Sequence, residues 1–310
     1  MKLSIITINY NNAEGLRKTM ESVLKQTYLD FEYIIVDGAS TDGSVDVIRE
    51  YVEASPKSSH EGKDLHDADN NSLPSDGGLP RLGNPNGRNS GERRSNQTAG
   101  GRPITWTSEP DNGIYDAMNR GIRKAKGEYT LMLNSGDFLV DEYVLERIIP
   151  ELDGTDIVQG NIIIAKEDKE IIKCGYGKSD ISFIDVMKGH FLHQASFCKK
   201  DLFERYGCFD ESYRINGDTV FYAKCLGFGN ASFRYVNQSI AYYDTTGISA
   251  DPDKKWLSLR KEEDRRYAQM FSKRMWDLFY KEEKKIKLYD KLHAHKWSWC
   301  ITMGIAKLLK

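Results

Sequence analysis

The fold is decided by residues 1–52, which read MKLSIITINYNNAEGLRKTMESVLKQTYLDFEYIIVDGASTDGSVDVIREYV. Residues 3–8 and 31–36 are apolar runs of strand length. Each run is followed by apolar side chains at helical spacing: Leu16, Met20, Val23 and Leu24 after the first, and Val45, Ile48 and Val52 after the second. This order predicts the β-α-β-α beginning of an α/β domain.

Residues 55–103 interrupt this pattern. They contain 8 Gly, 5 Pro, 6 Asn and 7 Ser and no aromatic residue, so they cannot bury enough apolar surface to offset their ordering entropy. We interpret them as a disordered insertion. The alternative is a linker between independent domains, which is disfavoured because the residues before it cannot complete a core alone.

The α/β pattern then resumes. Residues 104–108 have the character of a strand, and an apolar stripe over 114–125 predicts a helix. Residues 128–133 predict another strand, and residues 156–174 predict a hairpin. From about Trp256 the chain is helical, basic and aromatic. We therefore assign 1–250 to one domain and 251–310 to a basic helical C-terminal extension.

Composition excludes some classes of partner. The 310 residues carry 44 Lys and Arg against 46 Asp and Glu, so no chain-wide basic field indicates nucleic acid. Five scattered cysteines without a C-x-x-C pair indicate reduced thiols in a cytosolic protein. No apolar run is long enough to span a membrane or to act as a signal peptide.

The tail from 254 to 310 differs from the rest of the chain, with 16 Lys and Arg against 7 Asp and Glu. Such a tail is suited to an anionic surface, and its apolar end, residues 297–309, is long enough to lie on a bilayer. We therefore expect a cytoplasmic protein with peripheral contact to the inner face of the cell membrane through 254–310. A terminal helix packed on the domain is the alternative.

Polar residues follow the predicted strands at their carboxyl ends, where ligands bind in open α/β sheets. Four such stretches stand out: Thr7 to Asn12, Val36 to Gly43, Ser108 to Gly113, and Asn134 to Asp137. Their carboxylates, amides and hydroxyls suit a polar ligand, but the same residue types also form ordinary turns and helix caps.

At these stretches the chain resembles the family 2 glycosyltransferases that build bacterial surface polysaccharides. The resemblance runs from Met1 to about Tyr243, apart from the insertion, and is carried by SIITINYNN, EYIIVDGASTDGS, SEPDNGIYDAMNRGIRKAKGEYTLMLNSGD and KKDLFERYGCFDESYRINGDTVFYAKC. It implies a GT-A fold, with a Rossmann-like nucleotide-binding mixed sheet flanked by helices. It also implies inverting transfer of a hexosyl or N-acetylhexosaminyl group from a nucleotide sugar, with a uridine donor favoured, to a glycan or polyprenyl-diphosphate-linked acceptor.

The resemblance also assigns the donor and metal residues. Family members usually carry Asp-x-Asp after the fourth strand, whereas here Asp137 is the only carboxylate of the turn. Asp137, with phosphate oxygens and waters, would hold Mg²⁺ or Mn²⁺; a helix-capping Asp is its alternative. The resemblance implies nucleotide or donor contacts for six more residues: Thr7, Asn9, Asp37, Asp111, Asp116 and His193. For these six residues the alternative is a structural role in a turn, in a helix cap or in the core.

Inverting transfer needs one carboxylate that removes the proton of the acceptor hydroxyl. Asp218 aligns with the carboxylate of the family's Glu-Asp motif, and Gly217 replaces the Glu. We predict Asp218 as this base, with a helix N-cap as its alternative. Two other functions stay open: a non-catalytic nucleotide- or carbohydrate-binding protein on the same fold, and a sugar-phosphate nucleotidylyltransferase. The second is disfavoured because the first strand ends without a Gly-rich triphosphate loop.

Overall fold

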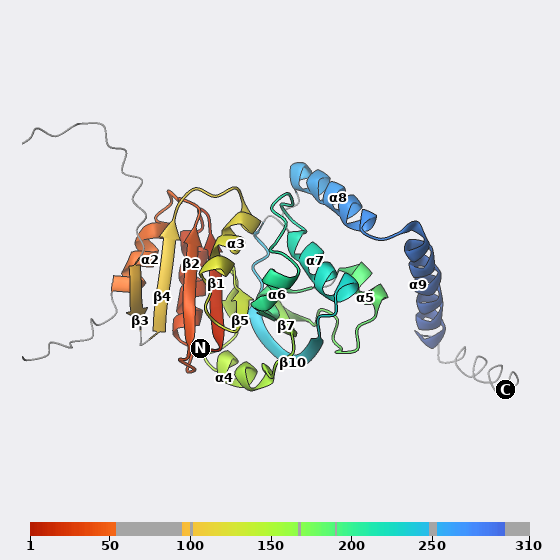
Figure 1. Ribbon diagram of the computed structural model, residues 1–310, viewed down its shortest axis with the longest axis horizontal. Coiled ribbons are helices and arrows are strands. Elements are labelled where there is room, and N and C mark those ends of the chain that lie inside the picture. Colours follow the sequence, from red (N-terminus) through yellow and green to blue (C-terminus); the bar gives the residue numbers. More distant parts are fainter. Residues whose placement is uncertain (54–94, 100–101, 167–168, 190, 248–252, 295–310) are drawn as a thin grey trace, which may run out of the picture.

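A computed structural model describes residues 1–53, 95–99, 102–166, 169–189, 191–247 and 253–294. These residues form one ten-stranded mixed sheet with helices on both faces (Figure 1). The strands are β1 (Leu3–Asn9), β2 (Phe31–Asp37), β3 (Ser95–Ala99), β4 (Arg102–Ser108), β5 (Tyr129–Met132), β6 (Phe138–Leu139), β7 (Ile157–Lys166), β8 (Lys169–Lys173), β9 (Ser196–Lys199) and β10 (Phe233–Tyr242).

The α-helices are α1 (Ala13–Leu24), α2 (Ser44–Glu53), α3 (Ile114–Lys124), α4 (Val144–Ile148), α5 (Phe183–Lys188), α6 (Asp201–Arg205), α7 (Gly217–Tyr222), α8 (Lys254–Gln269) and α9 (Lys273–Ala294). Short turns of 3-10 helix occur at η1 (Ile149–Glu151) and η2 (His193–Ala195), and η3 (Ala223–Phe228) is π-helical. The predicted α/β fold with helices on a mixed sheet is therefore confirmed.

The register of the sheet determines which residues meet at its edge. The strand order is β3-β4-β2-β1-β5-β9-β7-β10-β6, and β8 pairs with β7 as the predicted hairpin. Strands β4, β2, β1 and β5 run parallel, with Asn9 opposite Asp37 and Asp37 opposite Ser108. Because parallel strands end at the same edge, these three polar residues form one row.

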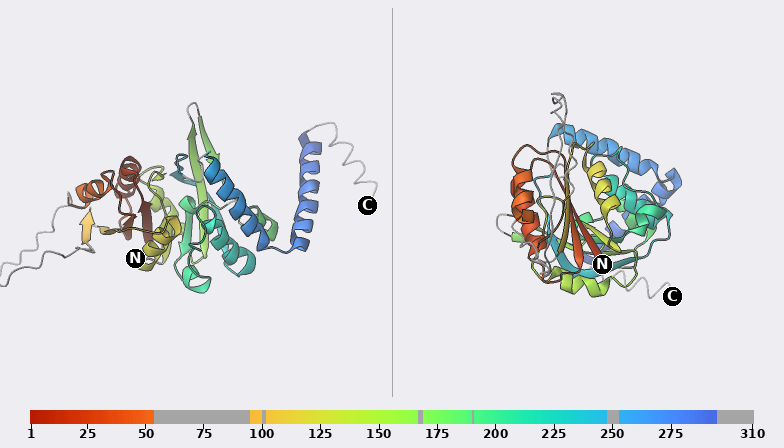
Figure 2. Two further views of the ribbon diagram at one scale, coloured as in Figure 1. Left: turned by 90° about the horizontal axis from the view of Figure 1, so that it is seen from above. Right: turned by 60° about the vertical axis from the view of Figure 1, so that its left-hand side comes forward.

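Two apolar cores lie on opposite faces of the sheet. Every residue of β1 and β2 is buried, as expected for parallel strands covered on both sides. Helix α1 packs on one face through Leu16, Met20 and Val23, and α3 packs on the other through Met118 and Ile122. Figure 2 shows the helices on the two sides of the sheet. The apolar faces predicted for these helices are the faces that are buried.

Part of the predicted insertion has regular structure. Residues 95–99 form β3, which pairs antiparallel with β4, and β4 begins at Arg102 rather than at 104. The predicted disorder of 55–103 therefore does not hold for residues 95–99 and 102–103, because their backbones pair at the edge of the sheet. Residues 54–94 lie outside the described residues.

The C-terminal helices differ in how they contact the domain. Helix α8 lies beside α7, and α9 extends away from the sheet (Figures 1 and 2). Tyr267 of α8 donates its hydroxyl to the carbonyl of Val186, and Phe271 packs edge-on against Phe183 of α5. The extension predicted from residue 251 is thus joined to the domain through α8. Among the described residues, no helix has the length and apolarity needed to cross a membrane.

Candidate active site

The row of strand ends is organised around the Asp37 carboxylate. Asp37 is fully buried and accepts four hydrogen bonds. Asn9 Nδ2 and Ser40 Oγ donate to Oδ1 at 2.8 and 2.6 Å, and the Ser40 N–H and Ser108 Oγ donate to Oδ2 at 3.0 and 2.6 Å. Asn9 Oδ1 is buried and has no donor among the described residues. An orphaned acceptor of this kind suits the N–H of a ligand.

Asp111 and Tyr10 lie beside this row. Asp111 Oδ1 accepts the N–H of Gly113 at 2.9 Å, so Asp111 closes a turn rather than capping α3 by itself. Its Oδ2 lies 2.6 Å from the position that a Cβ on Gly38 would take, so a larger residue at position 38 would displace the Asp111 side chain. Tyr10 also lies against Gly38, and 67% of the Tyr10 surface is exposed. The sequence argument missed this exposed aromatic ring, whose only signal is its place directly after β1.

Thr7 does not face the site. Its side chain is fully buried, donates to the carbonyl of Leu133 at 2.7 Å, and accepts the hydroxyl of Tyr33 at 3.0 Å. The nucleoside contact expected of this side chain is corrected to a structural role, because both of its hydrogen-bonding functions serve to join β1 to its neighbours.

Asp116 is also occupied within the fold. Its carboxylate accepts the N–H of Asn112 at 2.9 Å and both Nε and Nη2 of Arg120, at 3.0 and 2.8 Å. Burial acts to raise the pKa of Asp116, but these donors outweigh it and lower the pKa below its ordinary value. The donor contact expected of Asp116 is corrected to an ion pair that secures the start of α3.

The turn after β5 places Asp137 in a dry environment. Only 4% of Asp137 is exposed, and Oδ1 accepts the N–H of Asp244 at 2.8 Å. Thr19 of α1 holds the turn, accepting from the N–H of Gly136 at 3.0 Å and donating to the carbonyl of Asp137 at 2.7 Å. Burial raises the pKa of Asp137 to about 7, against the opposing charge of His193. Strand β6 follows directly, so Asp137 caps no helix.

Asp244 is a second carboxylate at this turn, which the sequence argument did not find. Its Oδ2 lies where a side chain on Gly136 would be, and its charge contributes to the raised pKa of Asp137. The two residues are 107 positions apart and meet because β10 ends beside β6. No group of three metal-ligating side chains occurs in the described ranges.

His193 lies between the predicted base Asp218 and the turn of residues 134–137. Its Nδ1 lies 3.1 Å from Asp218 Oδ2, and its Nε2 lies 3.3 Å from Asn134 Nδ2. The side chains of His193 and Asp218 are 19% and 14% exposed, so both border the site. Burial acts to lower the pKa of His193, but the hydrogen bond and charge of Asp218, with the charge of Asp137, raise it overall.

Asp218 is fixed from its other side by α3. Tyr115 OH lies 3.2 Å from Asp218 Oδ1, and that oxygen also accepts the N–H of Thr219 at 2.8 Å. Burial and the charge of Asp218 raise the pKa of Tyr115, so its hydroxyl keeps its proton. Asn216, not Asp218, is the N-cap of α7. The carboxylate is therefore directed toward His193 instead of capping the helix.

Comparison with known proteins shows which family the chain resembles. Residues 4–70 match the model of glycosyl transferase family 2. A PGL/p-HBAD biosynthesis glycosyltransferase of Mycobacterium tuberculosis is 28% identical over 247 residues, which cover 79% of this chain and 77% of the relative. An uncharacterized glycosyltransferase of the same organism is 26% identical over 285 residues, covering 86% and 85%. The chain is thus similar to the family 2 glycosyltransferases, through the family model over residues 4–70 and through relatives of 26–28% identity.

Solved structures agree with this chain in fold. S. aureus TarS 1-349 aligns with a TM-score of 0.55 at 14% identity, covering 79% of this chain and 61% of that one. The mannosyltransferase PcManGT of Pyrobaculum calidifontis aligns with a TM-score of 0.50 at 16% identity, covering 84% and 59%. This chain therefore spans less than two thirds of those structures. The shared architecture confirms the predicted GT-A fold.

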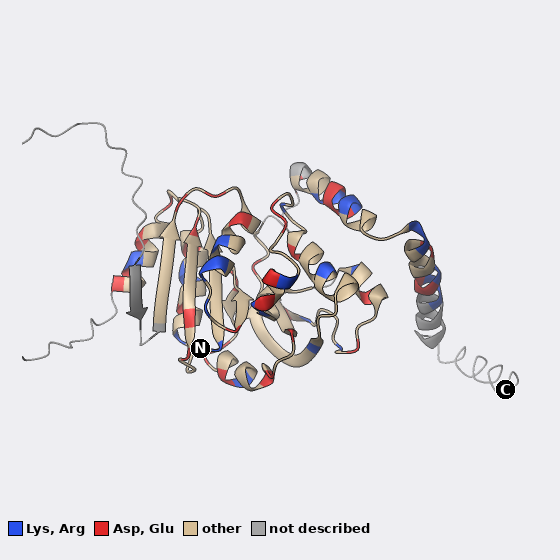
Figure 3. Ribbon diagram, viewed as in Figure 1, with Lys and Arg blue, Asp and Glu red and all other residues tan. Residues whose placement is uncertain are grey.

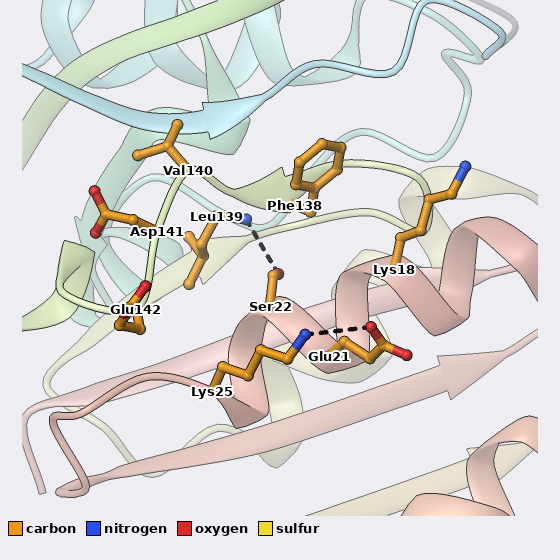
Figure 4. A pocket seen from close by; sticks show the side chains of 9 residues that line it. All are labelled: Lys18, Glu21, Ser22, Lys25, Phe138, Leu139, Val140, Asp141 and Glu142. Carbon is orange, nitrogen blue, oxygen red and sulfur yellow. Dashed lines mark hydrogen bonds and ion pairs between the residues drawn. The ribbon is translucent and has the colours of Figure 1, made fainter.

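A hollow of about 320 Å³ lies away from these residues, between α1 and β6 (Figure 4). Lys18 and Lys25 border it, and each pairs with a glutamate four residues earlier on α1, at 3.1 and 3.5 Å. Its cations are therefore compensated within the helix. None of the predicted site residues of the glycosyltransferase lines this hollow.

Proposed function

We propose that this glycosyltransferase inverts the anomeric centre of a UDP-sugar as it transfers one hexosyl or N-acetylhexosaminyl group to an acceptor hydroxyl. The acceptor class is a glycan or polyprenyl-diphosphate-linked glycan of a cell-surface polysaccharide, met at the inner face of the membrane. The observation that carries the proposal is the hydrogen-bonded line from Asp218 through His193 to Asn134, which brings a carboxylate to the turn of residues 134–137. Inverting transfer needs this pairing of a base with a leaving-group site.

The strand-end row is the proposed nucleoside site. Asn9 offers a buried acceptor, Asp37 holds Asn9 in place, and Asp111 and Tyr10 border the opening above Gly38. An exposed tyrosine ring beside buried acceptors suits a flat base with N–H donors. TarS has been crystallised with UDP and with UDP-GlcNAc, and PcManGT with GDP-Man and Mn²⁺. These neighbours support a nucleotide-sugar donor as a class.

The proposed metal is Mg²⁺ or Mn²⁺, held by Asp137 and Asp244 together with donor phosphate oxygens. The residues fit a divalent ion, because two carboxylates meet at one turn and burial raises the pKa of Asp137 to about 7. Like charges brought together in a dry site are relieved by a cation. When bound, the ion would compensate the negative charge of the departing diphosphate.

Asp218 is the proposed base, which takes the proton of the acceptor hydroxyl as that oxygen attacks the anomeric carbon. Tyr115 and His193 hold its two oxygens from opposite sides, so the carboxylate does not need to reorient for each turnover. Burial acts to lower the pKa of His193, but Asp218 and Asp137 raise it overall, and His193 Nδ1 lies 3.1 Å from Asp218 Oδ2, between the proposed base and the turn of residues 134–137. His193 is thus proposed to assist both the base and the diphosphate.

The substitution Asp218→Asn tests the mechanism. We expect UDP-sugar binding within about 3-fold of the wild type and transfer lowered by about 10²–10⁴-fold, the contribution of a general base. Binding is measured by calorimetry and transfer by UDP release in the presence of Mn²⁺. Asp277→Asn, at an exposed position of α9, is the matched control and should behave as the wild type.

Other outcomes of this assay separate the alternatives. Equal transfer by Asp218→Asn and the wild type would remove Asp218 from its role. Binding without UDP release across a panel of donors and acceptors would favour a non-catalytic binding protein. Release of pyrophosphate from a nucleoside triphosphate and a sugar phosphate would indicate a nucleotidylyltransferase instead.

The C-terminal extension is the proposed membrane-facing part. Lys and Arg residues are spread along α8 and α9 (Figure 3), and Leu278 and Tyr280 of α9 are more than half exposed. Exposed apolar side chains beside cations suit the surface of an anionic bilayer. In this proposal the extension keeps the enzyme near a lipid-linked acceptor.

A further inference from the structure

Glu263 of α8 is a buried carboxylate that the reaction described above does not use. Its exposed fraction is 1%, and it accepts the backbone N–H groups of Arg214, Ile215 and Asn216 at 2.6, 2.9 and 2.9 Å. Hydrogen bonds to an ionised acceptor are about twice as strong as those between neutral groups. Helix α8 therefore grips the backbone of residues 214–216 directly.

Neighbouring side chains of α8 hold the same loop. Asp264 accepts Asn216 Nδ2 at 2.8 Å. Arg266 donates to the carbonyl and hydroxyl of Ser212 at 3.1 and 2.6 Å, and its guanidinium lies 3.8 Å from the centre of the Tyr213 ring. One stretch of α8 thus holds residues 212–216 by charge, hydrogen bonds and a cation–π contact.

The segment held in this way leads directly to the base. The backbone of Ile215 is fixed on both sides, since its N–H donates to Glu263 and its carbonyl accepts Tyr115 OH at 2.6 Å. That same hydroxyl lies 3.2 Å from Asp218. Gly217, at the start of α7, packs on the Tyr115 ring so closely that a Cβ would lie 2.7 Å away. A shift of the Ile215 backbone would therefore displace both Tyr115 and Asp218.

The segment also reaches the donor side. Arg214 Nη1 donates to the carbonyl of Asn112, in the turn that Asp111 closes. Gly113 has a φ of 117° and leaves the room that the Arg214 side chain occupies. Residues 214–216 therefore contact α8, the turn that Asp111 closes, and the Tyr115 hydroxyl beside Asp218.

We propose that Glu263 is a positioning residue, which acts through the 214–216 backbone to place the Asp218 carboxylate against the acceptor hydroxyl. The proposal rests on the role proposed above for Asp218. It gives the C-terminal extension a part in catalysis that is separate from any contact with a membrane.

The test compares Glu263→Gln with Glu262→Gln, an exposed neighbour on the same helix. Glutamine keeps the size of the side chain but loses the charge and directs N–H groups at N–H groups. We expect Glu263→Gln to lower kcat by about 10- to 100-fold, the effect of a small misplacement of a reacting group. The KM and the dissociation constant for the donor should stay within about 2-fold of the wild type. Glu262→Gln should leave kcat unchanged.

A double mutant distinguishes positioning from general loosening of the structure. If Glu263 acts through Asp218, adding Glu263→Gln to Asp218→Asn should lower the residual kcat by less than about 2-fold. Additive losses, or a kcat of Glu263→Gln equal to that of Glu262→Gln, would overturn the proposal. If instead Asp218→Asn transfers sugar like the wild type, the proposed base itself falls, which is a different result.

If Glu263→Gln does not fold, a second variant tests the same proposal. Arg266→Gln removes the contacts to Ser212 and Tyr213 from the more accessible side of the helix. With circular dichroism and thermal melting as checks of folding, a lower kcat at unchanged donor affinity would support the proposal. If Glu263→Gln does not fold, an unchanged kcat for folded Arg266→Gln would overturn the proposal.

Discussion

At the scale of single residues, the site is defined by side chains whose hydrogen bonds are incomplete or whose charge is poorly solvated. Asp37 is fully satisfied by four donors, whereas the neighbouring Asn9 keeps a free buried acceptor. Asp137 is a carboxylate in a dry turn with a pKa near 7. Such groups cost stability in the free protein and gain a partner when a ligand binds.

The raised pKa of Asp137 predicts a pH-dependent cost in stability. The ordinary value is 3.8 and the folded value is about 7, so the unfolded chain releases this proton first as the pH rises. The carboxyl therefore favours the unfolded state increasingly between about pH 4 and pH 7, and the full cost persists above that. We expect Asp137→Asn to raise the free energy of unfolding by the order of 1–4 kcal/mol at pH 8.

This gain should shrink toward pH 5, where the wild-type carboxyl is protonated in the folded state, and transfer should be lost at every pH. Urea unfolding of both proteins across this range, without metal or nucleotide, is the measurement. A gain that is equal at pH 5 and pH 8 would contradict the assignment of the shift to Asp137.

At the scale of elements, the ends of α8 and α9 have different surroundings. Helix α8 is attached through buried Glu263 and Tyr267, while α9 exposes Leu278 and Tyr280. Helix α8 thus holds residues 212–216, which precede Asp218, and leads along the chain to α9.

Deleting residues 297–310 should weaken binding to anionic liposomes by about 10-fold or more, because the segment carries apolar side chains and two lysines. Turnover of a water-soluble acceptor should persist. Sedimentation with phosphatidylserine vesicles measures binding, and neutral vesicles serve as the control. Binding that is unchanged by the deletion would favour a terminal helix packed on the domain.

At the scale of the whole molecule, the site is assembled from strands that are distant in sequence. Asp37 ends β2, Asp137 lies between β5 and β6, Asp244 follows β10, and Asp218 is the second residue of α7. The nucleobase and the diphosphate of the donor would contact different parts of this assembly. Binding at one part should therefore prepare the other.

We accordingly expect Mn²⁺ and UDP to bind cooperatively, each lowering the dissociation constant of the other by about 10-fold. The physical reason is that the diphosphate supplies ligands which Asp137 and Asp244 alone do not. Asp137→Ala and Asp244→Asn should each bring this factor close to one, and Asp277→Asn should not. Calorimetric titrations of each ligand with and without the other measure it; strong Mn²⁺ binding to the nucleotide-free protein would contradict the metal site.

The local pattern of the sequence was sufficient for the α/β class, for the first elements of the fold and for the strand ends where the candidate site residues lie. Side-chain periodicity over 10 to 15 residues identified β1, α1, β2, α2 and α3, because burial of one face repeats with the geometry of each element. The rule that ligands meet the carboxyl ends of strands led to Asn9, Asp37, Asp111 and Asp137. These conclusions depend only on neighbours along the chain.

Tertiary structure decided which of those residues are available. Thr7 and Asp116 are occupied by Leu133, Tyr33 and Arg120, and no local pattern reports such partners. Asp244 reaches Asp137 across 107 residues, and Glu263 reaches Ile215 across 48. A carboxylate's role depends on its burial and on the donors around it, and in this protein both are set by packing between distant segments.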